Sequence, residues 1–236
     1  MQAATAQTIQ AEVVSIEAVT DFVNVVKLKP LTEATFLAGQ YCQIVLAEDD
    51  KRVFSIGSSP TAELLELHIG AGPEDSYPRG ALIHLEQNEV VTLEVGLGHA
   101  SLQADSKRPV ILMAGGTGFS YTKSIADYLA EFQPNQTVLM YWGVRDEAAL
   151  YAKQEMELWA KSHPHFQFIP VVQDASDDWT GKTGYVHKAV MEDIISLEPY
   201  DIYLAGPFKM AGIARDDFIK HGALREHMHA DAFAFI

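Results

Sequence analysis

The segment from Pro109 to Tyr121 constrains the fold of this chain more than any other part of the sequence. A short apolar run, Val110–Ala114, passes directly into the glycines Gly115, Gly116 and Gly118, after which a helical pattern begins. This order predicts a buried strand that delivers a turn to the N-terminus of a helix. Glycine permits positive φ and a close backbone approach, and the free N–H groups and positive pole of the helix attract a phosphate. We expect this turn to receive the pyrophosphate of a dinucleotide.

The turn departs from the usual dinucleotide-binding fingerprint. Reading G-x-G-x-x-G from Gly116 puts Tyr121 where the third glycine normally stands. Gln136 lies about 20 residues further on, where an acidic residue usually binds the ribose. The pattern alone therefore leaves open a glycine-rich turn that binds no ligand.

Composition restricts the class of protein and its partners. A chain of 236 residues is long enough for one large domain or two ordinary ones. Its formal net charge of −15 argues against nucleic acid or an anionic membrane as a partner, since both are bound through clusters of lysine and arginine. Cys42 is the single cysteine, so no internal disulfide or cysteine-ligated iron–sulfur cluster is expected. We expect a cytoplasmic enzyme, because no apolar run is long enough to span a bilayer and residues 1–7 lack the features of a secretory signal.

The periodicity of the sequence changes near residue 105, which predicts two domains, residues 1–104 and residues 105–236. The first part reads as short strands separated by turns, with a short helix at 81–85. Six strands at this spacing predict a closed antiparallel β-barrel of the Greek-key type. The expected strands are 8–16, 22–29, 40–46, 52–57, 64–69 and 90–95.

In the second part, strands alternate with helices. The strands are apolar nearly throughout, which predicts a doubly wound α/β domain whose parallel sheet is covered by helices on both faces. The expected strands are 110–114, 137–142, 166–172 and 201–205, and the expected helices are 120–132, 147–161, 187–196 and 210–221.

One strand of the first part carries a family motif. Arg52, Phe54 and Ser55 bring together a cation, an aromatic ring and a hydroxyl, which suits a planar ring system that bears a phosphate. By the strand period of two, Arg52, Phe54 and Ile56 share one face. This R-x-F-S sequence resembles the flavin motif of the ferredoxin-NADP reductase superfamily. Within it, the chain most resembles the bacterial NAD(P)H:flavin oxidoreductases, relatives of the flavin reductases that serve bioluminescence.

The resemblance covers essentially the whole chain, because further motifs follow in the family's order. They are A-G-Q-Y at 38–41, L-E-L-H-I-G at 65–70, A-G-G-T-G-F-S-Y at 114–121, Y-W-G-V-R at 141–145, A-G-P-F-K-M at 205–210 and the tail D-A-F-A-F-I at 231–236. Together these motifs are much stronger evidence than any one of them.

Two departures from the family pattern concern the flavin. Residues 71–78 are acidic and interrupted by proline, where the wider superfamily has a Gly- and Ser-rich clamp for the FAD pyrophosphate. This difference favours a flavin that binds and leaves. In addition, Val53 stands where the motif usually has proline, and residues 96–99 lack the expected P-x-G.

The resemblance implies transfer of a hydride from C4 of NADH or NADPH to N5 of an oxidised flavin (FMN, riboflavin or FAD), after which the reduced flavin departs. Such direct transfer requires positioning and charge tuning rather than a nucleophile or a metal. Ser55, which hydrogen-bonds near flavin N5 or O4, and Ser120, which reaches the reacting rings from the other domain, are the expected catalytic residues. The other expected flavin-binding residues are Arg52 at the ribityl or phosphate end, Phe54, His68, Ile69, Gly70 and a terminal ring, Phe233 or Phe235.

On the nicotinamide side, the resemblance places the dinucleotide on turns of the second domain. Arg145 is expected to pair with a 2′-phosphate or the adenine ring, but Asp146 and Glu147 discourage that phosphate. NADH is therefore the expected donor, and use of NADPH is left open. The expected dinucleotide-binding residues are Gly115, Gly116, Thr117, Gly118, Phe119, Trp142 (which also suits core packing), Gly143, Arg145, Gly206, Pro207, Phe208 and Met210.

Two other functions remain open from the sequence. One is an electron transferase that holds FAD tightly and feeds ferredoxin or a haem protein, and the other is a nucleotide-binding regulatory protein without turnover. The sequences H-P-H at 163–165 and H-M-H at 227–229 lack supporting ligands at metal spacing, so no metal is expected. The expected partners are a small-molecule flavin and an acceptor of reduced flavin, such as luciferase, a monooxygenase or a ferric complex. A monomer and a homodimer are both consistent with the sequence.

Overall fold

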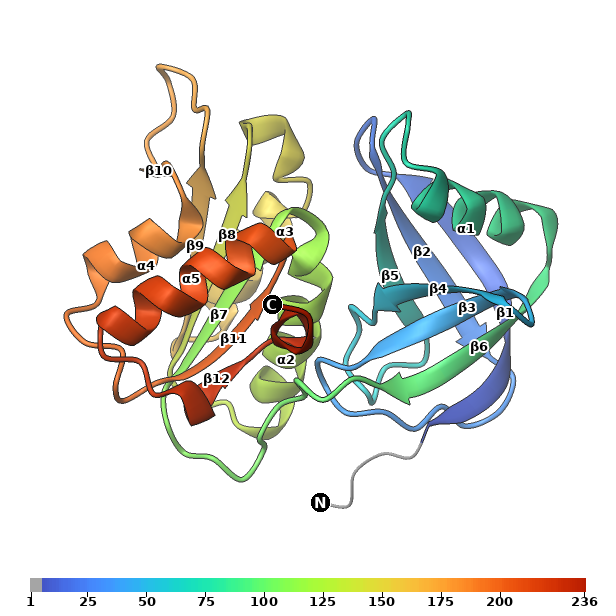
Figure 1. The fold of residues 1–236 in the computed structure, drawn as a ribbon, viewed down its shortest axis with the longest axis horizontal. Coiled ribbons are helices and arrows are strands. Elements are labelled where there is room, and N and C mark those ends of the chain that lie inside the picture. Colours follow the sequence, from blue (N-terminus) through green and yellow to red (C-terminus); the bar gives the residue numbers. More distant parts are fainter. Residues whose placement is uncertain (1–5) are drawn as a thin grey trace.

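The computed structural model describes residues 6–236, which form two lobes lying side by side (Figure 1). The first five residues, on which part of the expectation about a secretory signal rests, lie outside the described residues. One lobe holds an antiparallel sheet of six strands, and the other holds a parallel sheet of six strands with helices on both faces. The predicted fold class is therefore confirmed.

The first lobe is the barrel. Its strands are β1 (Gln7–Ala18), β2 (Val23–Pro30), β3 (Tyr41–Ala47), β4 (Asp50–Ser55), β5 (Leu65–Gly70) and β6 (Val90–Leu97). They pair in the order β4-β3-β6-β1-β2-β5, so β6 returns to lie between β1 and β3. The two edge strands meet where Ile56 bridges Leu67 and the N–H of Gly57 donates to the carbonyl of Glu66 at 2.6 Å. Alternate residues of each strand fill the core, as the strand period requires.

Helix α1 (Ser76–Gln87) is longer than the helix expected at 81–85. Pro78 lies in its first turn, where the missing N–H removes no intrahelical hydrogen bond. The proline that interrupts the sequence pattern therefore does not interrupt the helix. Leu82 and Leu85 pack into the barrel core, and this docking sets Tyr77 against Arg52 of β4.

The second lobe alternates strands and helices as expected. Its strands are β7 (Val110–Gly115), β8 (Val138–Val144), β9 (Phe166–Val172), β10 (Lys182–Thr183), β11 (Asp201–Ala205) and β12 (Met228–His229). They run parallel in the order β10-β9-β8-β7-β11-β12. Helices α2 (Phe119–Phe132) and α3 (Lys153–Ser162) cover one face, and α4 (Val186–Asp193) and α5 (Phe208–Lys220) cover the other. β10 and β12 were not predicted, because a strand of two residues has no periodicity to detect.

The helix expected at 147–161 is in fact two pieces. Asp146 accepts a hydrogen bond from the N–H of Ala149 at 3.2 Å and so caps a single 3₁₀ turn, η2 (Glu147–Ala149). The helix α3 starts only after a break. The break leaves Tyr151 outside any helix and turned toward the barrel, where its hydroxyl lies 2.8 Å from Nδ1 of His68.

Helix α2 and the C-terminal tail join the two lobes. The hydroxyl of Ser124 in α2 donates to the carbonyl of Ser58 at 2.8 Å. In the tail, the Asp231 carboxylate accepts the N–H groups of His99 and Ala100, at 3.0 and 3.3 Å, from the segment that leads out of the barrel. These contacts set the end of β4 opposite the carboxyl ends of β7 and β11.

The domain boundary predicted at residues 104 and 105 falls between β6 and β7, and its position stays a prediction. Within residues 6–236, no helix combines the length and the apolar character needed to cross a membrane.

Candidate functional site

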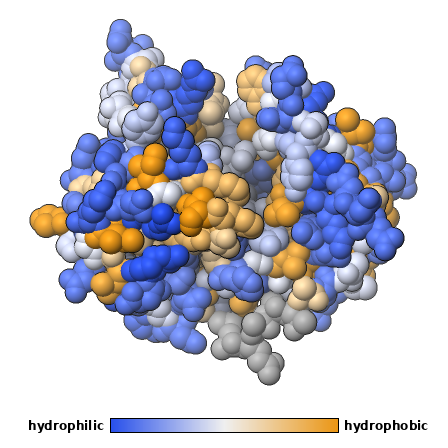
Figure 2. Space-filling view, viewed as in Figure 1, coloured by the Kyte–Doolittle hydropathy of each residue, from blue (hydrophilic) through white to orange (hydrophobic). Residues whose placement is uncertain are grey.

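A cleft of about 290 Å³ lies between the lobes, at the carboxyl ends of β7 and β11. Crevices at this edge of a parallel sheet are where open α/β proteins bind ligands. The lining residues are Val53, Phe54, Ser55, His68, Thr117, Gly118, Ser120, Tyr121, Leu204, Ala205, Gly206, Phe208, Asp231 and Ala232. Figure 2 shows apolar side chains gathered on this face of the molecule, where α5 and the C-terminal tail lie beside the groove between the lobes.

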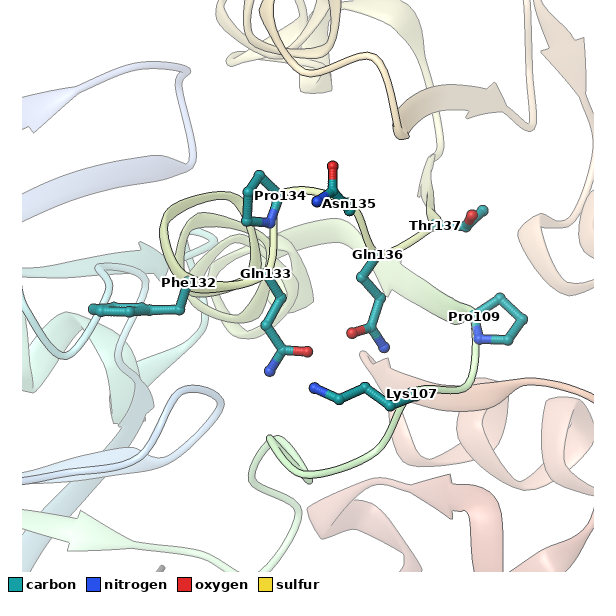
Figure 3. Close-up of a pocket in the computed structure, with 8 residues that line it drawn as sticks. All are labelled: Lys107, Pro109, Phe132, Gln133, Pro134, Asn135, Gln136 and Thr137. Carbon is teal, nitrogen blue, oxygen red and sulfur yellow. The ribbon is translucent and has the colours of Figure 1, made fainter.

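A larger cavity of about 500 Å³ lies at the amino ends of β7 and β8 (Figure 3). It is lined by Lys107, Pro109 and residues 132–137. The amides of Gln133 and Gln136 donate to backbone carbonyls there, at 2.7 and 2.6 Å, so these groups hold the loop together. This is the sheet edge opposite to the glycine-rich turn, and none of the predicted site residues lines it. The smaller cleft is therefore the candidate site.

The end of β4, which carries the R-x-F-S motif, supplies the barrel-side wall of the cleft. Ser55 is the last residue of β4 and pairs with Tyr41 of β3. Phe54 packs partly on the barrel core and partly on the cleft. Within residues 6–236, no protein group forms a hydrogen bond with the Ser55 hydroxyl, so this hydroxyl is available to a ligand.

Arg52 does not line the cleft. Its Nη2 lies 2.6 Å from Oδ2 of Asp50, its Nε pairs with the other oxygen of that carboxylate, and its Nη1 donates to the Tyr77 carbonyl at 3.1 Å. Because Arg52 donates to it, the pKa of Asp50 is lowered. Arg52 is thus already neutralised by a carboxylate, and it would have to leave Asp50 to meet a flavin phosphate.

The predicted residues of β5 differ in what they offer. Ile69 is fully buried in the barrel core, so its side chain cannot reach a ligand. Gly70 lies against the glycine-rich turn, where a Cβ would stand 3.0 Å from Cγ2 of Thr117. The side chain of His68 is 3% exposed, and both of its ring nitrogens have protein partners. His68 lines the cleft as a fixed part of its wall.

The glycine-rich turn is shaped for close approach. Gly116 has a φ of +55° and open space where a Cβ would stand, whereas a Cβ on Gly118 would lie 2.4 Å from the carbonyl oxygen of Ala205. Gly206 has a φ of +150°, and a Cβ there would lie 3.2 Å from Cα of Gly115. These contacts bring the ends of β7 and β11 together, which other residue types would prevent.

Phe119 and Trp142 correct the sequence-based prediction. Both side chains are fully buried, and their rings stack with centres 4.1 Å apart. Nε1 of Trp142 donates to the carbonyl of Gly116 at 2.9 Å. The two rings therefore support the turn from the core and do not present a surface to a cofactor. For Trp142, core packing was the alternative interpretation, and the structure places its side chain in the core.

Three other residues predicted to bind the dinucleotide, Gly143, Pro207 and Met210, determine how neighbouring elements pack. A Cβ on Gly143 would lie 2.5 Å from Cβ of Val186, so this glycine lets α4 approach β8. Pro207 is the residue that precedes α5, and Met210 packs on Gly115 and Gly206 from the first turn of that helix.

Ser120 lines the cleft but is only 2% exposed. Its hydroxyl donates to the carbonyl of Thr117 at 3.1 Å, and its Cβ faces Gly57 of the barrel. The hydroxyl therefore holds the glycine-rich turn, and the predicted contact with the reacting rings would require it to give up this bond.

Arg145 and Phe235, two further predicted site residues, are largely exposed and are not among the residues that line the cleft. The Arg145 side chain is 82% exposed and pairs with Asp174 at 3.3 Å. Phe235 is 73% exposed, and its ring stacks on that of Phe208 with centres 5.6 Å apart. Since Phe208 lines the cleft, Phe235 stands at its mouth.

Sequence reasoning missed Asp231 and Tyr151. Asp231 lines the cleft and fixes the tail to residues 99 and 100. The available signal was a carboxylate within an otherwise apolar tail. Tyr151 gave no signal, because its contact with His68 exists only after the two lobes pack.

Comparisons with known proteins also indicate an oxidoreductase that binds a nicotinamide dinucleotide. The model of the oxidoreductase NAD-binding domain matches residues 112–216. The chain is 44% identical over 236 residues to an NAD(P)H-flavin reductase of Vibrio harveyi, covering 97% of this chain and 100% of the relative. It is 37% identical over 209 residues to a probable flavin reductase of Aliivibrio fischeri, covering 85% and 87%. Among solved structures, the ferredoxin reductase in carbazole 1,9a-dioxygenase aligns with a TM-score of 0.84 at 26% identity, over 99% of this chain and 71% of that chain. Among residues 6–236, no group of three or more His, Cys, Asp or Glu is arranged to hold a metal ion.

Proposed function

The chain belongs to the NAD(P)H-flavin reductase family, and from this premise we propose that it transfers a hydride from NADH or NADPH to a flavin that binds and leaves as a substrate. The nicotinamide loses the hydride, and the flavin gains it together with one proton from solvent. The observation that carries this proposal is the cleft itself, which sets Ser55 of the barrel opposite the glycine-rich turn of the second lobe.

Ser55 is the residue proposed to act on the flavin directly. Ser55 lines the cleft, and its hydroxyl has no protein partner among the described residues, so we expect it to donate a hydrogen bond near N5 or O4 of the ring. Phe54 offers an apolar surface for the ring beside it. His68 completes the wall on the barrel side, and we propose that its backbone and that of Gly70 face the pyrimidine edge of the flavin.

The dinucleotide is proposed to lie along the turn from Gly116 to Gly118 and across Gly206. The backbone at Gly116 is open, and Gly206 carries no side chain that would hold the nicotinamide away from the flavin. Ser120, Phe119 and Trp142 stabilise this turn from behind. On this proposal, the barrel domain binds flavin and residues 105–236 bind the dinucleotide.

The electrostatics of the site favour a flavin that dissociates over a tightly held FAD. Among residues 6–236, no lysine or arginine lines the cleft, whereas Asp231 does. The cation of the R-x-F-S motif, Arg52, is paired with Asp50. An FAD-containing electron transferase, the alternative, would need cations or free N–H groups for two phosphates.

NADH is the proposed donor, with NADPH as a poorer one. Arg145 is the cation nearest the end of β8, and Asp174 already pairs with it. The adjacent Asp146 and Glu147 add negative charge where a 2′-phosphate would be expected.

We also propose a cytoplasmic location and an acceptor that takes up reduced flavin, such as luciferase, another monooxygenase or a ferric complex. The single cysteine, Cys42, is buried and free, which suits a reducing compartment. A monomer and a homodimer are both compatible with this function, because both walls of the cleft come from one chain.

The test is steady-state oxidation of NADH and NADPH with riboflavin, FMN or FAD added, with the flavin content of the purified protein measured alongside. Ser55→Ala is expected to lower kcat on the order of a hundredfold, as the loss of a well-placed donor does. Ser55→Thr keeps a hydroxyl and should retain more activity. Ser162→Ala, at the exposed end of α3, is the matched control. Equal rates in the Ser55→Ala and control variants would contradict the assignment, and stoichiometric bound FAD would favour the electron transferase.

A further inference from the structure

A partly buried chain of polar side chains runs from the barrel into the second lobe behind the cleft, and the proposed hydride transfer does not use these side chains. Glu66 and His68 lie on the face of β5 that points away from the barrel core. Nε2 of His68 lies 2.8 Å from Oε1 of Glu66, and Nδ1 lies 2.8 Å from the hydroxyl of Tyr151. Lys123 of α2 lies 3.4 Å from Glu66 and 2.9 Å from Asp127.

The charges of this chain fix the direction of its hydrogen bonds. Burial acts to raise the pKa of Glu66, but the hydrogen bond from His68 and the charge of Lys123 outweigh it and lower that pKa to about 2. Glu66 is therefore a carboxylate near neutral pH and accepts the Nε2–H of His68. With Nε2 as the donor nitrogen, the neutral tautomer of the imidazole has its lone pair at Nδ1. Burial raises the pKa of Tyr151, so its hydroxyl keeps the proton that it donates to Nδ1.

The imidazole of His68 also touches the base of the glycine-rich turn. Its centre lies 5.5 Å from that of Phe119, the first residue of α2, and 5.5 Å from that of Tyr151. Phe119 stacks on Trp142, which in turn bonds to the carbonyl of Gly116. The flavin-side strand β5 and the nicotinamide-side turn are thus connected through one buried ring.

We propose that Tyr151 is a positioning residue: by holding His68 it sets the distance between the flavin-side wall and the nicotinamide-side turn. Tyr151 does not line the cleft, so it acts through His68 and not on a substrate. The inference rests on the proposed function, because the distance in question separates the two rings between which the hydride passes. A misplacement of about 1 Å at such a site can cost about a hundredfold in rate.

Tyr151→Phe tests the proposal because it removes the hydroxyl and keeps the ring, which packs edge-on against Phe119 and Trp142. In rapid mixing of enzyme, NADH and riboflavin, the rate of hydride transfer is expected to fall about tenfold. KM for both substrates should change little, and the isotope effect with NADH deuterated at C4 should increase. The control is Tyr128→Phe on the same helix as Lys123; its ring packs on Phe132, and it should behave as wild type.

A double-mutant cycle separates positioning from general stability. If Tyr151 acts through His68, Tyr151→Phe should cost little further rate in a His68→Gln background. If the losses in rate caused by Tyr151→Phe and His68→Gln add in full, the proposal is overturned. So does a Tyr151→Phe enzyme that melts at a lower temperature but keeps the wild-type rate and isotope effect. A wild-type enzyme that oxidises NADH with no flavin at all defeats the proposed function, whereas an active wild type with an unaltered Tyr151→Phe variant defeats only the positioning role.

Discussion

At the scale of residues, a side chain can match the family motif and still be unavailable to a ligand, because another protein group already bonds to it. Ser55 and Ser120 were both expected to act on the reacting rings, yet Ser120 already donates to Thr117 while Ser55 has no protein partner among the described residues. In the same way, the guanidinium of Arg52 is held by Asp50. What the sequence can reveal is the residue type, and what the packed structure adds is which donors are left for a ligand.

Asp50→Asn tests the consequence of the Arg52 pair. The amide removes the negative charge that neutralises Arg52, so a flavin phosphate should compete better for the guanidinium. We expect KM for FMN to fall severalfold relative to KM for riboflavin, which has no phosphate and serves as the internal control. An equal change for both flavins would show that Arg52 does not reach the phosphate.

Glu66 should make the stability of the protein depend on acid pH. Its pKa in the folded protein is about 2, below the ordinary 4.5, so it adds stability above pH 4.5 that is lost as the pH falls toward 2. Glu66→Gln has no charge to lose, so its melting temperature should fall less steeply across this range. Burial raises the pKa of Asp127 in both proteins, and the charge of Glu66 adds to this shift, so Glu66→Gln should also lower the pKa of Asp127. If the melting temperatures of wild type and Glu66→Gln fell equally with pH, the low pKa would not belong to Glu66.

At the scale of elements, most helices and all strands except the two-residue β10 and β12 follow from periodicity and turn residues. The differences have local causes. Pro78 sits in the first turn of α1, where proline is tolerated, and Asp146 caps η2 and ends the apparent helix before α3 begins. The glycine-rich turn was predicted because its residue types are dictated by the backbone. The His68–Tyr151 contact was not, since it joins residues 83 positions apart that meet only when the lobes pack.

Gly118→Ala tests the close contact between the turn and β11. A Cβ there would lie 2.4 Å from the carbonyl oxygen of Ala205, a backbone atom that cannot move alone. We expect a loss of about 1–3 kcal/mol in unfolding free energy and a higher KM for NADH, because the turn must shift. Gly212→Ala in α5 is the control, since its Cβ would meet only Cδ1 of Ile236 at an ordinary 3.4 Å. Wild-type stability and KM in Gly118→Ala would refute the contact.

At the scale of the whole molecule, an acidic protein is proposed to bind anionic substrates. The net charge of −15 repels NADH and FMN at long range, and salt screens that repulsion. KM for NADH and for FMN should therefore fall as ionic strength rises from about 10 to 150 mM, where the Debye length shrinks from about 30 to 8 Å. KM for uncharged riboflavin should stay nearly constant. A rise in KM for the anionic substrates would indicate a local cationic site that dominates the net charge.

The most direct test of the central claim, a cleft in which NADH reduces an exchangeable flavin, is NADH oxidation by the gel-filtered protein with and without added riboflavin. The account predicts a preparation with little bound flavin, negligible oxidation alone, saturable oxidation once riboflavin is supplied, and a large loss of that activity in Ser55→Ala. No NADH oxidation with riboflavin, FMN or FAD in a folded wild-type protein would contradict it.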